Sequence, residues 1–238
     1  MKNNGSNDER FLVKRDLKGS GKPVVSLLNY RDGNETLDLL DLPVYEEELY
    51  ELVVLGPING MYVLYGRING ISVLLNPATR DFKALPVSTI PLAPHTSVLT
   101  DGVGFGFDPK TSDYKLVRIM ERWRYDENDN VLPWDDERQH HLAQVEVYTL
   151  GTGSWRKIDA VVPNYNNDSP LVNSYLNGFY YWLLYDGGDA AMYSCDMGDE
   201  VFCKRGKDLG VANSFTHHAY VFSEAIPSVV SSFPIHCV

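Results

Sequence analysis

A unit that occurs four times constrains the fold of this chain more than any other feature. Each copy has an apolar or aromatic lead-in, a small polar residue, a turn, and an aromatic residue six positions after the polar one. The four polar–aromatic pairs are Asn76 and Phe82, Asp108 and Tyr114, Thr149 and Trp155, and Asp196 and Phe202. The aromatic residue then begins a returning strand, where it can pack on the sheet face. Each copy therefore predicts a β-hairpin.

The residues inside the unit suit a tight turn. An Asp or Asn at the first position can accept hydrogen bonds from its own backbone, and a proline at the next position fixes φ. Pro77 and Pro109 take that position in two copies, and Gly151, Gly153 and Gly198 give conformational freedom in the other two. These choices support the hairpin prediction.

The spacing of the units suggests repeated blades. Their aromatic residues lie 32, 41 and 47 residues apart, and the four-stranded blades of β-propellers recur about every 40–50 residues. The Asn-Gly pairs at 59–60 and 177–178 each open an apolar strand ahead of a hairpin, and Asn-Gly favours tight hairpin turns. We predict an all-β fold: a partial or open β-propeller of about four to five kelch-like, four-stranded blades.

Three alternating glycines, Gly102, Gly104 and Gly106, stand before the second hairpin in the run GVGFGFDPKTSDYKLVRI. A dinucleotide-binding loop requires G-x-G-x-x-G before a helix. Phe107 occupies the position of the third glycine in that motif, and the β-rich run 114–119 follows. We interpret the glycines as allowing a close approach between neighbouring strands, and we predict no cofactor.

Charge and hydropathy limit the possible partners. The 238 residues carry a formal net charge of −11, whereas a nucleic-acid-binding protein needs a basic surface. An acidic chain suits a basic protein partner, although solubility alone also explains the charge. The N-terminus is polar, and the longest nearly apolar run, 179–185, is too short to span a bilayer. We expect no nucleic acid, no membrane, and a cytoplasmic or nuclear location.

The residues that could support catalysis are poorly arranged for it. The histidine pairs at 140–141 and 217–218 are adjacent, so on a strand their side chains would point to opposite faces rather than to one metal ion. The acidic clusters at 46–48, 126–127 and 135–137 lie in long polar segments, where solvated loop charge explains them. We predict no catalytic residue, no metal site and no enzymatic activity.

The long segment between Ile119 and Gln144 is the first candidate for contact with a partner. It interrupts the strand pattern and carries tryptophan, tyrosine and arginine, which dominate interface hot spots. An acidic loop whose tryptophans fold back onto the sheet is the structural alternative. The second candidate lies within 161–170. The predicted contact residues are Arg122, Trp123, Arg124, Tyr125, Asp126, Trp134, Asp135, Asp136 and Glu137, with Asn164 and Tyr165 from the second segment.

The joint order of these motifs resembles the F-box-associated domain of plant F-box proteins, and within that family the S-locus F-box proteins of pollen. The matching runs are GPINGMYVLY, VLLNPATRDFKALP, GFGFDPKTSDYKLVRI, QVEVYTLGTGSWRKID and NGFYYWL. The run FLVKR at 11–15 resembles the segment that follows the F-box. On this basis we predict a disordered segment 1–10, an F-box-associated domain 11–204 and an atypical tail 205–238.

The resemblance implies a substrate-recognition subunit of an SCF-type ubiquitin ligase. In that family the F-box docks on a Skp1-like adaptor and the propeller-like domain holds the target. For S-locus members the target is the stylar S-ribonuclease, a basic secreted enzyme, and its recognition underlies self-incompatibility. No F-box sequence precedes residue 11, so we expect a truncated family member that binds the adaptor only if a longer form restores the F-box.

Two other functional classes stay open at this point. One is a stand-alone propeller that binds a small molecule or sugar, with weak hydrolase chemistry. It would require a concave polar site with paired carboxylates from neighbouring blades. The other is a non-functional remnant that folds poorly.

Overall fold

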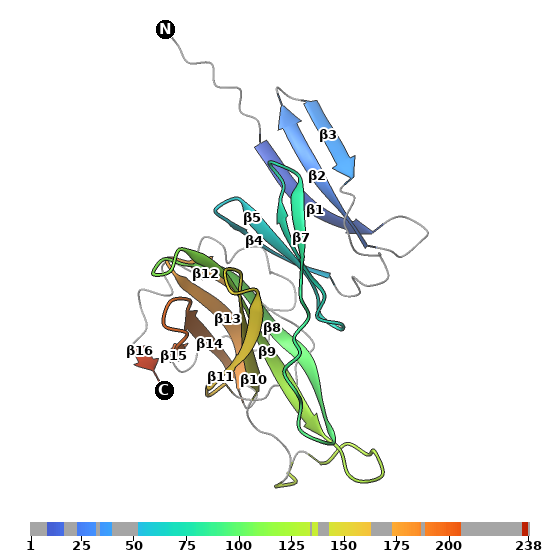
Figure 1. Ribbon diagram of the computed structural model, residues 1–238, viewed down its shortest axis with the longest axis vertical. Helices are drawn as coiled ribbons and strands as arrows, with labels where there is room; N and C mark the ends of the chain where they lie inside the picture. Colours follow the sequence, from blue (N-terminus) through green and yellow to red (C-terminus); the bar gives the residue numbers. More distant parts are fainter. Residues whose placement is uncertain are drawn as a thin grey trace. The chain divides into compact units, whose positions relative to one another are not determined.

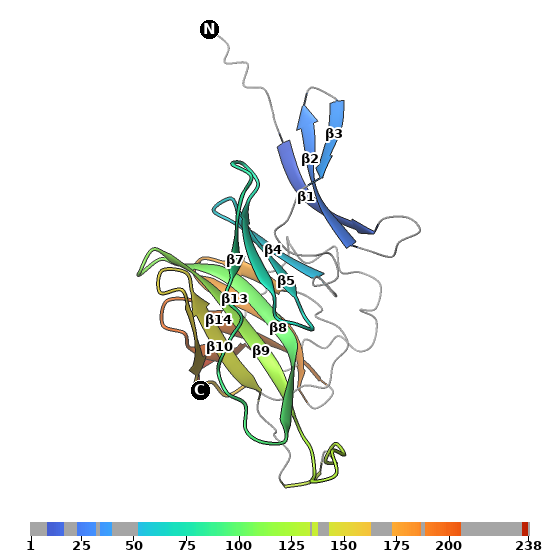
Figure 2. The same cartoon turned by 45° about the vertical axis from the view of Figure 1, so that its right-hand side comes forward.

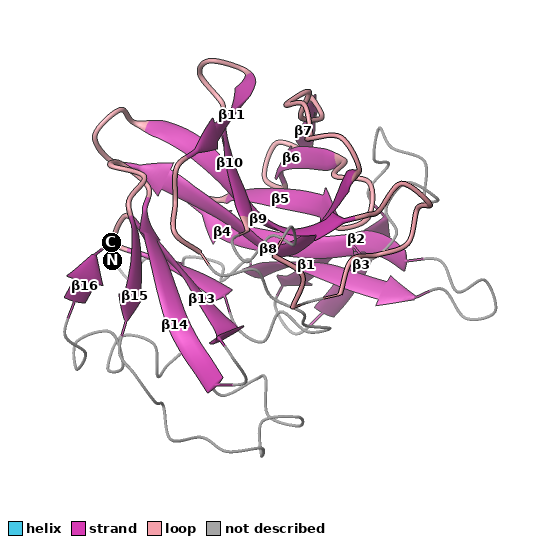
Figure 3. Ribbon diagram, turned by 90° about the horizontal axis from the view of Figure 1, so that it is seen from below, coloured by secondary structure: helices cyan, strands magenta, loops and turns pink. Residues whose placement is uncertain are grey.

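The computed structural model describes residues 9–16, 23–31, 34–39, 52–133, 135–137, 143–162, 173–186, 189–205 and 235–237. These residues form strands joined by turns and loops, and no helix occurs among them (Figure 1, Figure 3). The predicted all-β class is therefore confirmed. The chain divides into two compact units, residues 1–87 and 88–238, which are described separately below.

The first unit contains two antiparallel sheets. One has the order β1-β2-β3, with strands β1 (Glu9–Asp16), β2 (Pro23–Arg31) and β3 (Asn34–Leu39). The other has the order β4-β5-β6-β7, with strands β4 (Leu52–Ile58), β5 (Met61–Gly66), β6 (Ser72–Asn76) and β7 (Asp81–Leu85). Val25 of the first sheet packs in one apolar cluster with Leu52, Leu64 and Val73 of the second.

The second unit also contains two antiparallel sheets. One has the order β11-β10-β9-β8, with strands β8 (Thr96–Asp108), β9 (Asp113–Arg124), β10 (Gln144–Thr149) and β11 (Ser154–Ile158). The other has the order β12-β13-β14-β15-β16, with strands β12 (Asn173–Leu176), β13 (Phe179–Asp186), β14 (Asp189–Asp196), β15 (Phe202–Arg205) and β16 (Ile235–Cys237). A core that includes Val117, Val147, Trp182 and Phe202 joins the two sheets.

All four repeated units form hairpins with the same register, which confirms the hairpin prediction. The residue before the polar position pairs with the aromatic residue in every copy: Leu75 with Phe82, Phe107 with Tyr114, Tyr148 with Trp155, and Cys195 with Phe202. The last residue of each four-residue loop has φ between 55° and 66°, in the left-handed region, at Arg80, Ser112, Gly153 and Glu200. The spacing of six therefore reflects one loop conformation used four times.

The sequence suggested that each hairpin marks a new blade, but the intervals between the hairpins do not correspond to successive sheets. The hairpins that start at Asp108 and Thr149 both belong to the sheet β8–β11. Their 41-residue interval arises because β9 and β10 are joined by a long connection within that sheet. The four units thus lie in three sheets, and two of those sheets have four strands.

The two Asn-Gly pairs form the predicted tight turns. Both residues of each pair have positive φ, with 49° and 79° at Asn59 and Gly60 and 50° and 87° at Asn177 and Gly178. They join β4 to β5 and β12 to β13. Two consecutive positive φ values match the right-handed twist of the flanking strands.

The alternating glycines of β8 make room for aromatic rings of the facing sheet. A Cβ atom at Gly104 would lie 2.6 Å from atoms of both Tyr180 and Trp182, and one at Gly106 would lie 2.8 Å from Tyr175. The Trp182 indole N–H donates to the carbonyl oxygen of Val103 at 3.3 Å. The glycines are therefore structural, as we predicted, but they make room for side chains of the facing sheet β12–β16 rather than for neighbouring strands of their own sheet.

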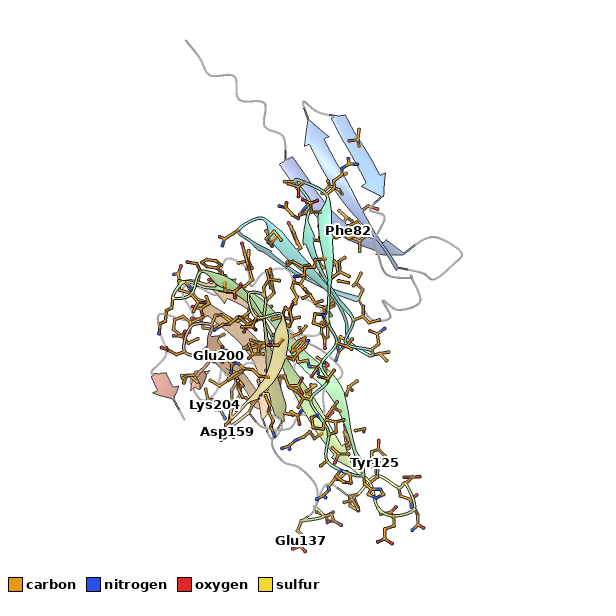
Figure 4. All side chains as sticks on the ribbon, viewed as in Figure 1. Phe82, Tyr125, Glu137, Asp159, Glu200 and Lys204 are labelled. Atoms are coloured by element: carbon orange, nitrogen blue, oxygen red, sulfur yellow. The ribbon has the colours of Figure 1, made fainter. Side chains whose placement is uncertain are left out.

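The aromatic residues of the four units differ in burial. Phe202 is 5% exposed and stacks on Trp182, whereas Phe82 is 46% exposed. Figure 4 labels Phe82, which belongs to β7. The prediction that the aromatic residue packs on the sheet is therefore wrong for Phe82. Phe82 lies on β7, which is the edge strand of its sheet, and the residues of this strand from Asp81 to Ala84 are all exposed.

Candidate partner-binding site

The first candidate residues belong to a strand rather than to a loop. Arg122, Trp123 and Arg124 end β9 and pair with residues 96–98 of β8. The prediction that this segment interrupts the strand pattern is therefore wrong as far as residue 124. The two strands stay paired on both sides of a register shift between Thr100 and Gly102. The run MERWR has no regular alternation of apolar and polar residues that would predict this extension.

Beyond Met120 the two strands continue as a two-stranded ribbon. β10 pairs with β9 only as far as the Met120–Gln144 pair, so residues 121–124 have β8 as their partner strand. Figure 1 and Figure 2 both show β8 and β9 running past the end of β10. We call residues 95–99 and 121–132 the ribbon end.

A compact turn closes the ribbon end. Asp126 Oδ1 accepts the backbone N–H groups of Asn128 and Asn130 at 2.8 and 2.9 Å, and the Asn130 side-chain amide donates to the same carboxylate. Leu132 N then donates to Arg124 O at 2.9 Å. Because its carboxylate organises the turn, Asp126 has a structural role in addition to the predicted contact role.

Tyr125 is fixed at the start of this turn. Its backbone N–H donates to His95 O at 2.9 Å, and its hydroxyl lies 2.9 Å from Ser97 Oγ. Figure 4 shows Tyr125 and Glu137 toward the far end of β9, away from Glu200. Tyr125 is half-buried, as are Arg122, Trp123 and Arg124.

The remaining predicted residues are only partly described. Asp135 and Glu137 are exposed, and Asp136 is half-buried with its N–H donating to Pro133 O at 3.0 Å. Trp134, Asn164 and Tyr165 lie outside the described residues. Residues 122–126 therefore lie together at the ribbon end, and the contact role of both candidate segments stays a prediction.

The segment 122–137 is acidic. It contains six carboxylates and two arginines, and the carboxylates of Glu127, Asp129, Asp135 and Glu137 are exposed. A surface with this charge raises the local concentration of cationic partners and speeds their encounter.

Sequence reasoning missed Glu121, the residue that begins the ribbon. Glu121 is 2% exposed, and its Oε1 atom has no hydrogen-bond partner. Burial raises the pKa of its carboxyl to about 7, although a hydrogen bond from the Trp123 side chain acts in the opposite direction. A charged residue within a strand is normally assigned to the solvent side, so the sequence held no sign of this burial.

A second polar group lies at the turn end of the β8–β9 hairpin, opposite the ribbon end. We call Asp108, Lys115, Arg156 and Glu200 the tip cluster. Lys115 Nζ lies 2.9 Å from Asp108 Oδ2 and 2.8 Å from Glu200 Oε1, and it donates to Met197 O at 2.6 Å. Arg156 pairs with the other oxygen of Glu200. Asp108, Lys115, Arg156 and Glu200 thus join the two sheets of this unit through charged groups.

The Asp108 carboxylate of the tip cluster is held ionised. Burial alone would raise its pKa, but hydrogen bonds from Thr111, Lys115 and the Lys110 backbone lower the pKa to about 2. Its side chain has no exposed surface. Asp108 therefore has neither a proton to donate at neutral pH nor access to a substrate.

A third polar group lies across β9, β10 and β11. Arg118 donates through Nη2 and Nε to Glu146 Oε2 at 2.6 and 3.0 Å, and Gln144 donates to Glu146 Oε1 at 2.7 Å. The Arg118 guanidinium also lies 4.6 Å from the centroid of the Trp155 ring. Both oxygens of this buried carboxylate are therefore satisfied within the sheet.

In the part of the chain that the structure describes, no group of three or more His, Cys, Asp or Glu side chains is arranged to hold a metal ion. Within the same residues, no helix is long and apolar enough to cross a membrane.

Comparison with known proteins identifies the class. Residues 24–204 match the family described as the F-box associated beta propeller domain, and the chain belongs to this family. It is also 31% identical over 141 residues to the F-box protein CPR1 of Arabidopsis thaliana. That match covers 57% of this chain but only 29% of the length of the relative. The resemblance to plant F-box proteins is thus confirmed at the level of the domain family.

Proposed function

We propose that the chain is the substrate-recognition domain of an F-box protein in an SCF-type ubiquitin ligase. Its membership of the F-box associated family supports this role. The observation that carries it is the ribbon end, an ordered extension that combines Trp123, Tyr125 and arginine with exposed carboxylates. In this proposal residues 11–204 form an open propeller of four to five blades, located in the cytoplasm or nucleus.

The proposed target is a basic protein, and the finer proposal is a stylar S-ribonuclease recognised in pollen self-incompatibility. The net charge of −11 and the exposed carboxylates of the ribbon end favour a cationic target. Contact with a Skp1-like adaptor is proposed only for a longer form that carries an F-box.

The arrangement of carboxylates favours recognition over hydrolysis. The sugar-binding alternative requires two accessible carboxylates from neighbouring sheets. Asp108 and Glu200 do come from facing sheets, but Lys115 bridges them and Asp108 has no exposed side-chain surface. This pair supports the structure and is not available to a substrate, so we propose no catalytic role.

A binding assay with matched charge reversals tests the proposal. The chain is immobilised, and its affinity for basic stylar S-ribonucleases is measured at low and at physiological salt. Glu127→Lys/Glu137→Lys alters the acidic segment 122–137, which includes the turn of the ribbon end, and Asp81→Lys/Asp159→Lys makes the same change in net charge at exposed sites elsewhere. We expect the first variant to weaken binding about tenfold or more, with most of the effect at low salt.

Three outcomes would count against this proposal. If no ribonuclease binds to a demonstrably folded chain, the S-locus target is wrong. If both double variants weaken binding equally, the target responds to net charge and the ribbon end is not the site. If the chain captures a Skp1-like adaptor by itself, the proposed separation of adaptor and target binding is wrong.

A further inference from the structure

Glu121 is a buried carboxyl without a cationic partner among the described residues. Burial raises its pKa and the hydrogen bond from Trp123 acts in the opposite direction, and the resulting pKa is about 7. No described cation contributes, and Oε1 accepts no hydrogen bond. This contrasts with Glu146, whose two oxygens are bonded to Arg118 and Gln144.

The register places uncharged and aromatic side chains around Glu121. It pairs with Leu99 of β8, and Trp123 pairs with Ser97. Because alternate residues share a face, Glu121, Trp123 and Tyr125 lie on one face, while Arg122 and Arg124 lie on the other. On β10, Glu146 pairs with Arg118, and strand alternation places both on the opposite face from Glu121.

An unpaired buried carboxylate is costly, and a cation supplied from outside removes that cost. Three properties of the ribbon end suit such a cation. The exposed carboxylates of Glu127 and Asp129 attract it, the half-buried aromatic side chains of Trp123 and Tyr125 share a face with Glu121, and the free oxygen of Glu121 can accept its N–H groups.

We propose that Glu121, flanked by Trp123 and Tyr125, receives a lysine or arginine side chain of the protein that this domain recognises. The identity of that partner as a target for ubiquitination rests on the proposed function, whereas the cation site itself does not. Oε1 is shielded from solvent, so a neighbouring side chain must move to admit the cation. Trp123 is half-buried and bonded to this carboxyl, and it is the side chain that this proposal requires to move.

The test uses small probes in place of the unidentified partner. The chain is labelled with carboxyl-¹³C glutamate, and the Glu121 resonance is followed from pH 4.5 to 9 with Nα-acetyl-arginine methylamide at saturating concentration. Nα-acetyl-citrulline methylamide has the same shape without the charge and serves as the control ligand. Glu121→Gln assigns the resonance and removes the acceptor, while Asp159→Asn makes the same charge change at an exposed position outside the ribbon end.

We expect the arginine amide to lower the apparent pKa of Glu121 by about one unit, and the citrulline amide to leave it unchanged. We expect Glu121→Gln to abolish saturable binding of the arginine amide and Asp159→Asn to keep it. Equal binding by wild type and Glu121→Gln, or an equal response to citrulline amide, would overturn the inference.

A parallel measurement separates this inference from the proposed function. If S-ribonucleases bind wild type and Glu121→Gln equally, the cation site is wrong while target recognition stands. If no ribonuclease binds but the arginine amide still requires Glu121, the cation site stands and the assigned target is wrong.

Discussion

The two ends of the β8–β9 hairpin are built from the same strands. They differ in whether their buried charged groups have hydrogen-bond and ion-pair partners. At the tip cluster, Asp108 and Lys115 are both buried and bonded to each other, and Lys115 also reaches Glu200 and Met197 O. At the ribbon end, the buried Glu121 keeps one oxygen without a partner. A fully bonded buried network rigidifies a structure, whereas an incomplete one leaves interaction energy available to a ligand. We interpret the tip cluster as a structural support and keep the ribbon end as the proposed binding surface.

The tip end is also tied to the other hairpin of its own sheet. Gly151 N donates to Asp113 Oδ2 at 2.8 Å, and Leu150 N donates to Tyr114 O at 3.0 Å. These bonds link the β8–β9 and β10–β11 turns. Changes at the tip should therefore affect the stability of the unit, and changes at the ribbon end should mainly affect binding.

The largest expected effect is that of Lys115→Met. The substitution keeps an unbranched chain but leaves Asp108 and Glu200 without their shared cation. Because Asp108 has no exposed surface, we expect a loss of about 3–5 kcal/mol in the free energy of unfolding, measured by denaturant titration. Lys110→Met is the matched control, since the Lys110–Asp199 pair at the same tip is more than half exposed. Equal effects of the two substitutions would contradict the assigned role of the cluster.

The contribution of Asp108 to stability depends on pH with a definite sign. The pKa of Asp108 is lowered from 3.8 to about 2 by its hydrogen bonds. Its stabilising contribution is therefore present above about pH 4 and is lost as the pH falls through 2. Lys115→Met removes one source of that lowering, so the variant should lose less stability than wild type between pH 4 and 2. A steeper acid loss in the variant would show that Lys115 does not hold Asp108 ionised.

The comparison of the two ends also shows which features of the structure could be predicted from the sequence and which could not. The hairpin register follows from local spacing and backbone preference, so it could be predicted, whereas the contact of the β8 glycines with the facing sheet could not. The Lys115–Glu200 pair could not, because the two residues are 85 positions apart and no local pattern joins them. The burial of Glu121 was also missed, since it depends on the extension of β8 beyond the sheet. Local geometry was thus predictable, and charge burial set by tertiary contacts was not.

Gly104→Ala should have the next largest effect, because it tests the scaffold away from its charges. The added Cβ would lie 2.6 Å from ring atoms of Tyr180 and Trp182, and those rings pack against each other with centroids 4.7 Å apart. We expect a loss of about 1–3 kcal/mol from overpacking, measured by thermal and denaturant unfolding. Gly60→Ala is the control, since nothing lies within 4 Å of its Cβ position and its cost comes from positive φ alone. Unchanged stability in Gly104→Ala would mean that the facing sheets are not in close contact there.

Glu121→Gln should stabilise the protein at alkaline pH, the opposite of what a substitution in the tip cluster does. The pKa of Glu121 rises from 4.5 to about 7 on folding because of burial. The folded state then holds more protons between these values, so wild-type stability falls as the pH rises from 4.5 through 7. We expect the variant to lack this slope and to gain about 1–2 kcal/mol over wild type at pH 8. Glu127→Gln should keep the wild-type slope; a slope that persists in Glu121→Gln would assign it to another group.

The smallest effect compares backbone strain at the two ends. Ser112, in the tip turn, and Asp129, in the turn of the ribbon end, have φ values of 55° and 60°. Serine gains little from this left-handed conformation, whereas Asp tolerates it through local hydrogen bonding. Replacement by glycine relieves strain but increases the entropy of the unfolded chain. We therefore expect Ser112→Gly to stabilise the protein by about 0.5 kcal/mol and Asp129→Gly to give no gain. A gain at Asp129 that matched the gain at Ser112, in parallel urea titrations, would show that the turn of the ribbon end is strained as well. In that case the two ends would differ only in the satisfaction of their buried charges.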